Sequence, residues 1–479
     1  MSKIKTREDA ENFIKENNIE FVSVRFTDLL GMQQHFTVPA EQFCDEGFTN
    51  GFFFDGSSIQ GFQGIEKSDM KLIPDVDTIY IDPFRTHKTV VCDFSIVDPY
   101  TDEPYSRDPR QVATKAEAYL RSTGVADTAI FAPEAEFFMF DKVRYDTRVN
   151  TSFYDVDAAE AAWNSGKKNN GPDEQDVPNK GIHEHMGQGY FPVPPLDHNQ
   201  DVRDEMMQNL TNAGLVLERA HHEVAQAQQE INYRYNTLLH AADDLMKYKY
   251  IVKNTAAKFG KVVTFMPKPL AGENGTGMHN HQSLWKDGKP LFYGDGYGQL
   301  SDIARWYIGG LIKHAGSVMA FTNPTTNSYR RLVPGYEAPV DLVYSARNRS
   351  AAIRIPIAGS APAAKRIEFR VPDTTANPYL AFSAEMMAGL DGVLNRIEPP
   401  DPIDKDLYEL PPEQAKGIKT VPNSLGESLD ILEADHDFLM QGDVFTQDLL
   451  DTWVKLKRNE ILQLRLTPTP QEFEMYFDA

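Results

Sequence analysis

Apolar and polar residues alternate with two different periods along the chain, which predicts both helices and strands. Thr6 followed by Asp9 approximates a capping box, so a short helix is expected near the N-terminus. Extended runs at residues 21–27 and 33–38, with a glycine in the turn between them, are typical of a β-hairpin. The chain therefore opens with a helix and the start of a small sheet.

The pattern changes near residue 108. Strand-like runs at residues 78–81 and 89–97 complete a β-rich region, and a helical pattern over residues 111–121 opens a longer part where both periods are mixed. The length of 479 residues alone would suggest about three domains of ordinary size. The pattern instead favours two domains, residues 1–108 and 109–479, and an α+β protein.

The later part of the chain predicts two exposed connections and two further helices. Residues 166–181 are polar, and residues 399–422 are rich in proline, so both predict exposed connections. Helical patterns return at residues 424–441 and 446–460.

Charge and cysteine content narrow the class of protein. The sequence holds 48 basic and 70 acidic residues, a net charge of −22, which argues against nucleic acid or an anionic membrane as partner. Its two cysteines form no CxxC pair, which argues against a disulfide framework or a zinc ribbon. We also find no signal peptide and no 18-residue apolar run, so a cytoplasmic globular protein is expected.

A first chemical signal lies in the apolar segment at residues 131–140. Glu134 and Glu136 would point to the same face of a strand, and Phe138 and Phe140 share that face. Two carboxylates held together in apolar surroundings need a positive partner. A solvated outer face is the alternative, which the two phenylalanines disfavour.

A second signal follows a glycine-rich bend. His279, His281 and Ser283 alternate along a strand-like run and would share one face. Ordinary buried histidines explain this pattern about as well as a ligand site does.

A third signal is a run of charges on one strand face: Arg366, Glu368 and Arg370. An exposed edge strand is the alternative. Residues 330–370 hold eight basic and three acidic residues, a local balance of +5 in an acidic chain. Arginines gathered against the overall charge suit phosphate or carboxylate ligands.

A fourth cluster contains His221, His222, Glu223 and Glu230. Together with the first three signals it gives a set dominated by carboxylates, with one or two imidazoles and no thiolates. Such a set prefers Mg²⁺ or Mn²⁺, and cations beside arginines indicate phosphoryl transfer. No P-loop or protein-kinase motif is present, so from chemistry alone the best reading is a two-metal phosphohydrolase.

Five longer motifs carry a resemblance to a known family. The motifs span residues 54–59, 268–283, 331–339, 348–356 and 365–370. In this order they resemble bacterial type I glutamine synthetase, and the similarity runs from the first hairpin to the C-terminus. The resemblance implies glutamate–ammonia ligation: ATP converts the γ-carboxylate of L-glutamate to an acyl phosphate, and ammonia displaces phosphate to give L-glutamine and ADP.

The resemblance also implies a fold and an assembly. Residues 1–108 would form a β-grasp domain, and residues 109–479 a catalytic domain that ends in a C-terminal helical arm. Antiparallel strands would form an active-site barrel shared between subunits of a homododecamer made of two stacked hexameric rings. The apolar spacing at residues 473–477 suits either that arm or a core helix.

Site residues carried over by motif form several sets. One divalent cation would be held by Glu136, Glu223 and Glu230, and a second by Glu134, His279 and Glu368. The positions that match nucleotide contacts are Glu218, His281, Ser283, Arg354 and Arg366. The positions that match contacts to glutamate or the transferred phosphate are Asn274, Gly275, Arg331, Arg349 and Arg370.

The ammonia step has its own implied residues. Asp55, with Ser58 and Tyr190 nearby, resembles the group that binds and deprotonates ammonium, and it would come from the neighbouring subunit. Glu337 resembles part of a flap that shields the intermediate from water. Tyr408 resembles the tyrosine that an adenylyltransferase modifies in many members; an ordinary loop tyrosine is the alternative.

One departure from the family pattern concerns the first cation. Glu223 and Glu230 are seven positions apart, one fewer than usual, and a glycine between them is missing. In a continuous strand this spacing would put the two carboxylates on opposite faces. Either a loop absorbs the difference or the first cation site is altered.

Three alternative functions remain open from the sequence. A relative could ligate glutamate to a polyamine or another amine, although Asp55 and the intact motif around it favour ammonium. A non-catalytic assembly protein of the same fold would have lost ligands, whereas all six ligand positions here are filled. The phosphohydrolase would turn over ATP without glutamate or ammonia.

Overall fold

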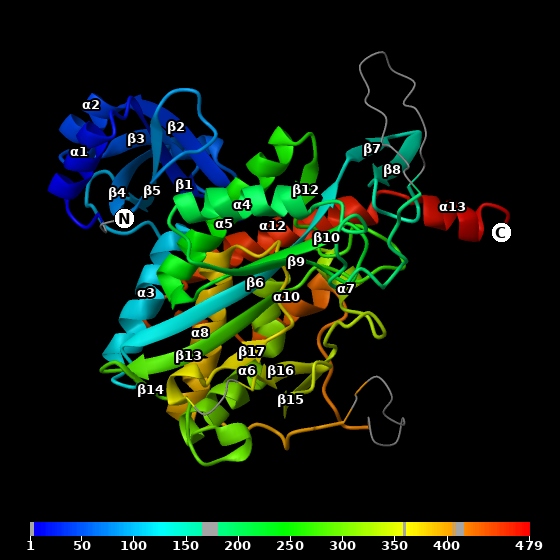
Figure 1. The fold of residues 1–479 in the computed structure, drawn as a ribbon. Helices are drawn as coiled ribbons and strands as arrows, with labels where there is room; N and C mark the ends of the chain where they lie inside the picture. The colour runs from blue at the N-terminus through cyan, green and yellow to red at the C-terminus, as the bar shows by residue number, and fades with distance from the viewer. Residues whose placement is uncertain (1–3, 165–180, 358–360, 406, 408–415) are drawn as a thin grey trace.

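The computed structural model describes residues 4–164, 181–357, 361–405, 407 and 416–479. It has two parts. The first is a small N-terminal sheet with one helix packed beside it, and the second is a larger α+β region that contains the second sheet and the long helices (Figure 1). No helix in the described ranges is long and apolar enough to cross a membrane.

The N-terminal part is a five-stranded sheet with the order β2-β1-β5-β4-β3. Its elements are α1 (Arg7–Glu16), β1 (Phe21–Thr27), β2 (Gln33–Pro39), β3 (Phe52–Asp55), β4 (Asp69–Ile81) and β5 (Thr89–Val97). The predicted capping box of Thr6 and Asp9 is present on α1, and the predicted hairpin is the β1–β2 pair. The β1 and β5 strands run parallel, while the other neighbours are antiparallel.

The larger part is built on a second sheet with the order β15-β16-β17-β13-β6-β10-β9. Its strands are β6 (Thr128–Phe140), β9 (Leu217–His222), β10 (Gln228–Tyr233), β13 (Met278–Lys286), β15 (Asp341–Ala346), β16 (Ala351–Ile355) and β17 (Ile367–Phe369). Three short strands also pair with this sheet: β11 (Asn236–Thr237) and β12 (Val262–Thr264) pair with β6, and β14 (Lys289–Pro290) pairs with β13. The predicted α+β class is confirmed, but the β15–β16 pair is parallel, so this sheet is mixed rather than purely antiparallel.

Long helices cover one face of the second sheet (Figure 1). They are α3 (Pro109–Ser122), α4 (Gln200–Asn212), α5 (Leu238–Lys258), α6 (Asp302–Thr322) and α8 (Pro378–Asn395). The side chains of β6 point alternately to the two faces of the sheet. The odd-numbered positions lie on the helix side: Phe131 stacks on Phe382 of α8 with ring centroids 5.0 Å apart, and the Tyr248 hydroxyl of α5 donates to the Ala135 carbonyl. The even-numbered residues of β6 consequently face away from these helices.

Smaller elements complete the chain. The two-stranded hairpin of β7 (Lys142–Arg148) and β8 (Thr151–Asp157) projects from the main body (Figure 1). The C-terminal helices are α10 (Leu425–Ala434), α11 (Asp437–Met440), α12 (Gln447–Arg465) and α13 (Pro470–Tyr476), and two short helices, α2 (Ala40–Gln42) and α7 (Ser328–Arg331), lie in loops. The helix predicted over residues 424–441 is thus two helices, because a break at Asp435 separates them.

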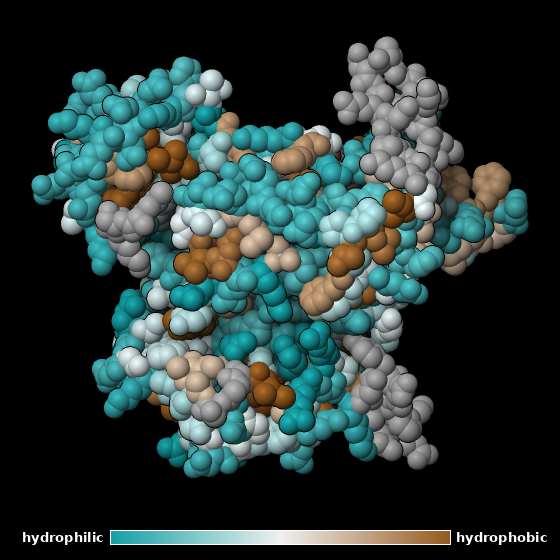
Figure 2. Space-filling model, in the orientation of Figure 1, coloured by the Kyte–Doolittle hydropathy of each residue, from teal (hydrophilic) through white to brown (hydrophobic). Residues whose placement is uncertain are grey.

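The last helix exposes its apolar side chains. Phe473, Met475 and Tyr476 are each more than half exposed, and Figure 2 shows apolar groups on this projecting end. A helix that carries this much exposed apolar surface lacks the burial that normally stabilises it. Exposed apolar surface of this kind is typical of a segment that packs against another chain.

Candidate active site

Strand register brings the charged residues of four strands onto one face of the second sheet. Glu136 of β6 pairs with Glu230 of β10, and Glu134 pairs with His279 of β13. On the other side of β13, His281 pairs with Glu368 of β17. Directly paired residues point to the same face, so the alternating motifs of the sequence converge.

The convergence creates a cavity of about 1070 Å³. Eleven of the predicted site residues line it: Glu134, Glu136, Tyr190, Glu223, Glu230, His279, Glu337, Arg349, Arg354, Glu368 and Arg370. All six predicted metal ligands are among them. The cavity wall thus holds both the predicted carboxylates and several of the arginines from the locally basic window.

A second cavity of about 400 Å³ adjoins the first, and Glu134 lines both. Four of the five predicted nucleotide contacts line it: Glu218, His281, Ser283 and Arg366; Arg354, the fifth, lines the larger cavity. Tyr233, Tyr235 and Trp285 add aromatic surface. Aromatic rings beside an arginine suit a planar base attached to phosphates.

Three carboxylates crowd one end of the larger cavity. Burial and the charge of Glu230 raise the pKa of Glu136 to about 8. Burial and the charges of Glu136 and Glu230 raise the pKa of Glu223 to about 10, and burial also raises the pKa of Glu230. Among the described residues no lysine or arginine forms an ion pair with these three. Arg331 and Arg370 offset the rise in the pKa of Glu136 only in part, so the group is suited to bind a cation.

A second group is closer to electrostatic balance. His279 Nδ1 lies 3.7 Å from an oxygen of Glu134 and 3.7 Å from an oxygen of Glu368. Burial would raise the pKa of Glu368, but the nearby histidines and arginines outweigh burial and lower this pKa to about 2. Arg354 Nε and Arg370 both donate to its carboxylate, the second over 2.6 Å.

His281 also approaches this group. Its Nε2 lies 2.9 Å from Glu134 Oε1, while Arg366 Nε donates to its Nδ1 over 3.1 Å. Because Nδ1 accepts that hydrogen bond, Nε2 carries the proton and donates to Glu134. In this arrangement His281 links the two cavities through Glu134.

The short Glu223–Glu230 spacing is absorbed by a loop. Strand β9 ends at His222 and β10 begins at Gln228, and the Glu223 amide donates to the Gln228 carbonyl over 2.9 Å. Ala227 takes a left-handed conformation with φ 64°, which closes the turn. Both carboxylates reach the same cavity, so the strand argument for opposite faces does not apply.

Several predicted residues do not line either cavity. Asn274 donates over 3.4 Å to Glu337, which lines the larger cavity, and the Gly275 carbonyl accepts over 3.1 Å from Gln228, which also donates to Glu136. Arg331 is buried and donates to the carbonyls of Val371 and Pro372.

Asp55 and Ser58 lie at the end of β3 in the N-terminal sheet. Asp55 accepts from the Ser57 amide over 2.8 Å and from the Ser58 hydroxyl over 2.9 Å. These hydrogen bonds lower its pKa and hold the carboxylate charged. Tyr408 lies outside the described residues.

Sequence reasoning placed His221 in the fourth cluster without giving it a role, and it missed Arg219. His221 Nδ1 lies 3.5 Å from Glu223, and its Nε2 lies 3.7 Å from Glu230. Burial lowers the pKa of His221 to about 4, which keeps the imidazole neutral. Arg219 also lines the cavity. The alternation of residues 219, 221 and 223 was the available signal, because these positions share one face of an extended chain.

Buried carboxylates, imidazoles and arginines around two joined cavities define a class of enzyme that binds cations and anionic substrates. Comparison with known proteins specifies the family. The profile described as "Glutamine synthetase, catalytic domain" matches residues 106–476, and "Glutamine synthetase, beta-Grasp domain" matches residues 18–99. The chain belongs to the glutamine synthetase family.

Individual relatives agree. The chain is 59% identical over 474 residues to a glutamine synthetase of Frankia alni, covering 98% of this chain and 99% of the relative. It is 60% identical over 475 residues to one of Streptomyces coelicolor, with coverage of 98% and 99%.

A solved structure of a Plasmodium falciparum glutamine synthetase has a TM-score of 0.91 at 30% identity, covering 99% of this chain and 100% of that one. The predicted family, the β-grasp and catalytic architecture, and the assignment as an ATP-dependent, glutamine-forming ligase are confirmed. The amine ligase is not favoured.

Proposed function

We propose that this chain joins ammonia to the γ-carboxylate of L-glutamate through γ-glutamyl phosphate, with the two cavities as its glutamate and nucleotide sites. The main support for this proposal is that the six predicted metal ligands line one cavity. Glu134 joins this cavity to the pocket lined by His281, Ser283 and Arg366. A phosphoryl group passing from the second cavity to the first would cross this shared wall.

The donor set fits two divalent cations. Glu136, Glu223 and Glu230 would hold one, because Glu136 and Glu230 are buried, Glu223 is partly buried, and no basic side chain among the described residues is in ion-pair contact with them. Glu134, His279 and Glu368 would hold the second. Bound Mg²⁺ or Mn²⁺ would neutralise phosphate oxygens and the attacking carboxylate.

The arginines would handle the remaining negative charge. Arg354 and Arg370 already flank Glu368 and line the cavity, so they can shift toward a transferring phosphoryl group with little reorganisation. Arg349 and Arg331, with Asn274 and Gly275, would orient glutamate. Glu218, His281, Ser283, Arg354 and Arg366 would contact ATP. Glu337 would cover the acyl phosphate and exclude water.

Asp55 would bind ammonium and accept its proton, with Ser58 and Tyr190 close to the same ion. Tyr190 lines the larger cavity, whereas Asp55 and Ser58 lie in the N-terminal sheet of the same chain. We therefore propose that Asp55 and Ser58 of one subunit complete the cavity of its neighbour. The exposed apolar face of α13 supports the proposed arm between rings, and both features fit a homododecamer with inter-subunit active-site barrels.

Three further parts of the proposal rest on the sequence. The division into residues 1–108 and 109–479 places the boundary in the connection between β5 and α3. Tyr408 is proposed as the site that an adenylyltransferase modifies. A cytoplasmic location is proposed because Cys44 and Cys92 are both free thiols.

An assay tests the reaction directly. We expect glutamine, ADP and phosphate to form from glutamate, ATP and ammonium with Mg²⁺ or Mn²⁺, and much slower turnover when putrescine replaces ammonium. ATP hydrolysis without glutamate and ammonium would contradict the ligase. Asp55→Ala should abolish ammonium-dependent synthesis, while the exposed Asp45→Ala should leave it unchanged.

Mixed assemblies test the shared site. Chains with Asp55→Ala and chains with Glu223→Gln should each be inactive alone. Random co-assembly should restore activity in about a quarter of the sites, because some sites then combine an intact N-terminal sheet with an intact cavity. No recovery on mixing would contradict a site built from two subunits.

A further inference from the structure

A second buried cluster of acidic and imidazole side chains lies behind the cavity wall. It contains His222 at the end of β9, Glu160 after β8, and Glu184; each of these residues is 1% exposed. The Glu184 amide donates to the Glu160 carbonyl over 2.9 Å, so the two acidic residues are held together by the backbone. None of the three lines the larger cavity.

The imidazole of His222 is oriented by carbonyl groups. Its Nδ1 lies 2.8 Å from the Gly189 carbonyl oxygen and 2.7 Å from the Glu223 carbonyl oxygen. Carbonyl oxygens only accept hydrogen bonds, so Nδ1 carries a proton. Metal-binding histidines have this arrangement, in which one nitrogen donates to a carbonyl and the other is left as the ligand.

The other nitrogen faces both carboxylates. His222 Nε2 lies 3.2 Å from Glu160 Oε1 and 3.1 Å from Glu184 Oε2. One ligand atom from each residue lies within 4.8 Å of the others. Donors bound tetrahedrally to one ion at about 2.1 Å are separated by roughly 3.4 Å, so only small shifts would be needed.

The carboxylates lack the partners that burial requires. Within the described part of the chain, neither oxygen of Glu184 accepts a hydrogen bond, and neither does Glu160 Oε2. Arg203, a nearby buried cation, is already paired with Asp197. A single proton on Nε2 would leave several oxygens unsatisfied, whereas a divalent cation would engage both carboxylates and the nitrogen at once.

We propose that Glu160, Glu184 and His222 bind a divalent transition-metal ion, with Zn²⁺ preferred, at a site separate from the two cations of the cavity. One imidazole and two carboxylates suit Zn²⁺, which accepts nitrogen and oxygen ligands in small, closed sites. The ion has a structural role. It fixes His222, whose ring holds Gly189 beside Tyr190 and also holds the backbone of Glu223.

Metal analysis of the full chain tests the site. Protein produced with added Zn²⁺ is treated with a chelator, which removes ions from the open cavity faster than from a fully buried site. We expect one zinc per chain to remain in the wild type and in Glu136→Gln, and to be lost in Glu184→Gln and Glu160→Gln. A wild type that retains no zinc overturns the proposal, and so do Glu184→Gln and Glu160→Gln proteins that both retain it.

A second measurement avoids reliance on variants that fold poorly. X-ray absorption at the zinc edge of the chelator-treated wild type should show nitrogen and oxygen ligands with one imidazole. A shell with a sulfur ligand, or one with two imidazoles, would place the ion elsewhere and overturn the assignment. Both measurements read metal binding rather than glutamine synthesis, so they are independent of the proposed function.

Discussion

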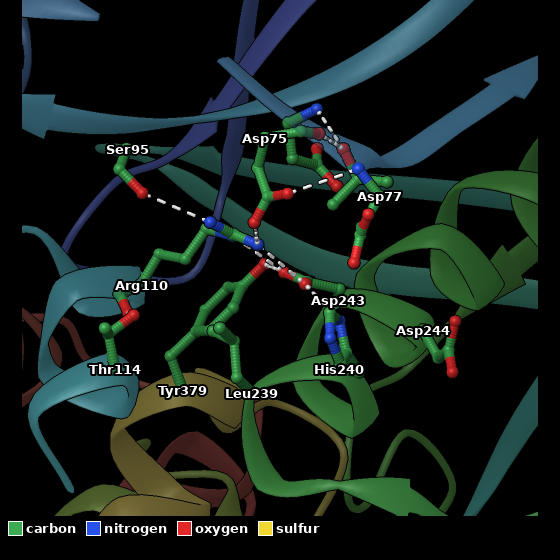
Figure 3. A network of polar contacts seen from close by, with 12 residues as sticks. Asp75, Asp77, Ser95, Arg110, Thr114, Leu239, His240, Asp243, Asp244 and Tyr379 are labelled. Carbon is green, nitrogen blue, oxygen red and sulfur yellow. Dashed lines mark hydrogen bonds and ion pairs between the residues drawn. The ribbon is translucent and has the colours of Figure 1, made fainter. Parts of the chain in front are cut away.

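Two clusters of charged residues differ in whether their carboxylates have counter-charges within the chain. One surrounds Arg110, where α3 and α5 meet the N-terminal sheet (Figure 3). The other is the group of Glu136, Glu223 and Glu230 in the larger cavity. The first contains its own counter-charges, and the second does not.

The Arg110 cluster is complete within the chain. Arg110 donates two hydrogen bonds, of 3.0 and 2.9 Å, to Asp243 of α5 and a third, of 2.6 Å, to Asp75 of β4 (Figure 3). Tyr379 of α8 donates to the same Asp243 carboxylate over 2.7 Å. Burial would raise the pKa of Asp243, but Arg110 outweighs it and holds this pKa well below its usual value. The cluster ties three helices of the larger part, α3, α5 and α8, to the N-terminal sheet.

The cavity group leaves its charge unbalanced in the same kind of environment. Its carboxylates repel one another, and only neutral His221 approaches Glu223 and Glu230 within ion-pair distance among the described residues. A structural cluster is stable when its buried charges are paired, whereas a binding site keeps an excess of charge that its ligand neutralises. Substitutions should therefore act on stability in the first cluster and on activity in the second.

The largest expected effect is on the Arg110 cluster. Arg110→Met removes the counter-charge of buried Asp243 and should lower the free energy of unfolding by about 3–5 kcal/mol. Denaturant unfolding measures this change. The matched control is Arg144→Met, since Arg144 and Asp155 form a half-exposed pair that should contribute about 1 kcal/mol or less. Equal losses in the two variants would contradict the contrast between buried and exposed pairs.

The cavity group should respond in the opposite way. Glu223→Gln removes one of three crowded carboxylates and should leave the metal-free protein as stable as the wild type or more stable. Its glutamine synthesis should fall more than a hundredfold, or by about 3 kcal/mol, because even groups that support metal ligands contribute 10–100-fold. Activity assays and unfolding without metal check both halves. A loss of metal-free stability would show that the group is balanced in some other way.

The strands of the site were predictable because their local pattern is unambiguous. Residues 131–140 alternate apolar and charged positions, and the structure has β6 over Thr128–Phe140. Residues 278–283 and 366–370 behave similarly and lie in or beside β13 and β17. The cap at Thr6 likewise fixed the start of α1, since capping depends only on neighbouring residues.

Two of the longest helices gave no such pattern. The α6 and α8 helices are apolar on nearly all sides and contain glycines, which normally weaken a helix. Their glycines permit close contact: a Cβ on Gly310 would lie 2.1 Å from the Ala388 carbonyl oxygen, and one on Gly392 would lie 2.1 Å from that of Trp306. Helices buried between other elements lack an amphipathic face, so periodicity cannot find them.

The local sequence pattern also could not predict which side chains come together in the cavity. His221 enters the site only because β9 and β10 pair in a register that places it opposite Glu230. Pairing between strands distant in sequence depends on the whole fold, and a one-residue slip would reverse every side chain. The family resemblance supplied the ligand sets that pattern alone left open.

A third buried carboxylate is satisfied by uncharged partners instead of by a counter-charge. Glu385 of α8 accepts hydrogen bonds from Asn280 and Gln282, both uncharged, and burial raises its pKa to about 8. The folded state thus holds a proton that the unfolded state releases near its ordinary pKa of 4.5. The stabilising contribution is complete below that pH and is lost as the pH rises through about 8.

Glu385→Gln should remove this dependence on pH. Between pH 5 and pH 7 the wild type should lose roughly 2 kcal/mol of unfolding free energy relative to the variant, because each pH unit corresponds to about 1.4 kcal/mol for one proton. Urea unfolding at several pH values gives the two slopes, and a constant cost of the substitution does not alter them. Parallel slopes would mean that Glu385 is already ionised in the folded protein.

The smallest effect is expected at the turn that delivers Glu223 and Glu230 to the cavity. A glycine inserted between Ala227 and Gln228 lengthens a loop that already brings both carboxylates together, so Mn²⁺ affinity should change less than about threefold, or 0.6 kcal/mol. The matched control inserts glycine between Gln229 and Glu230, within β10, where it shifts the register and turns Glu230 from the cavity. Mn²⁺ titration should show more than a tenfold loss in the control alone. A large change from the loop insertion would mean that the shorter connection is itself tuned to the cation.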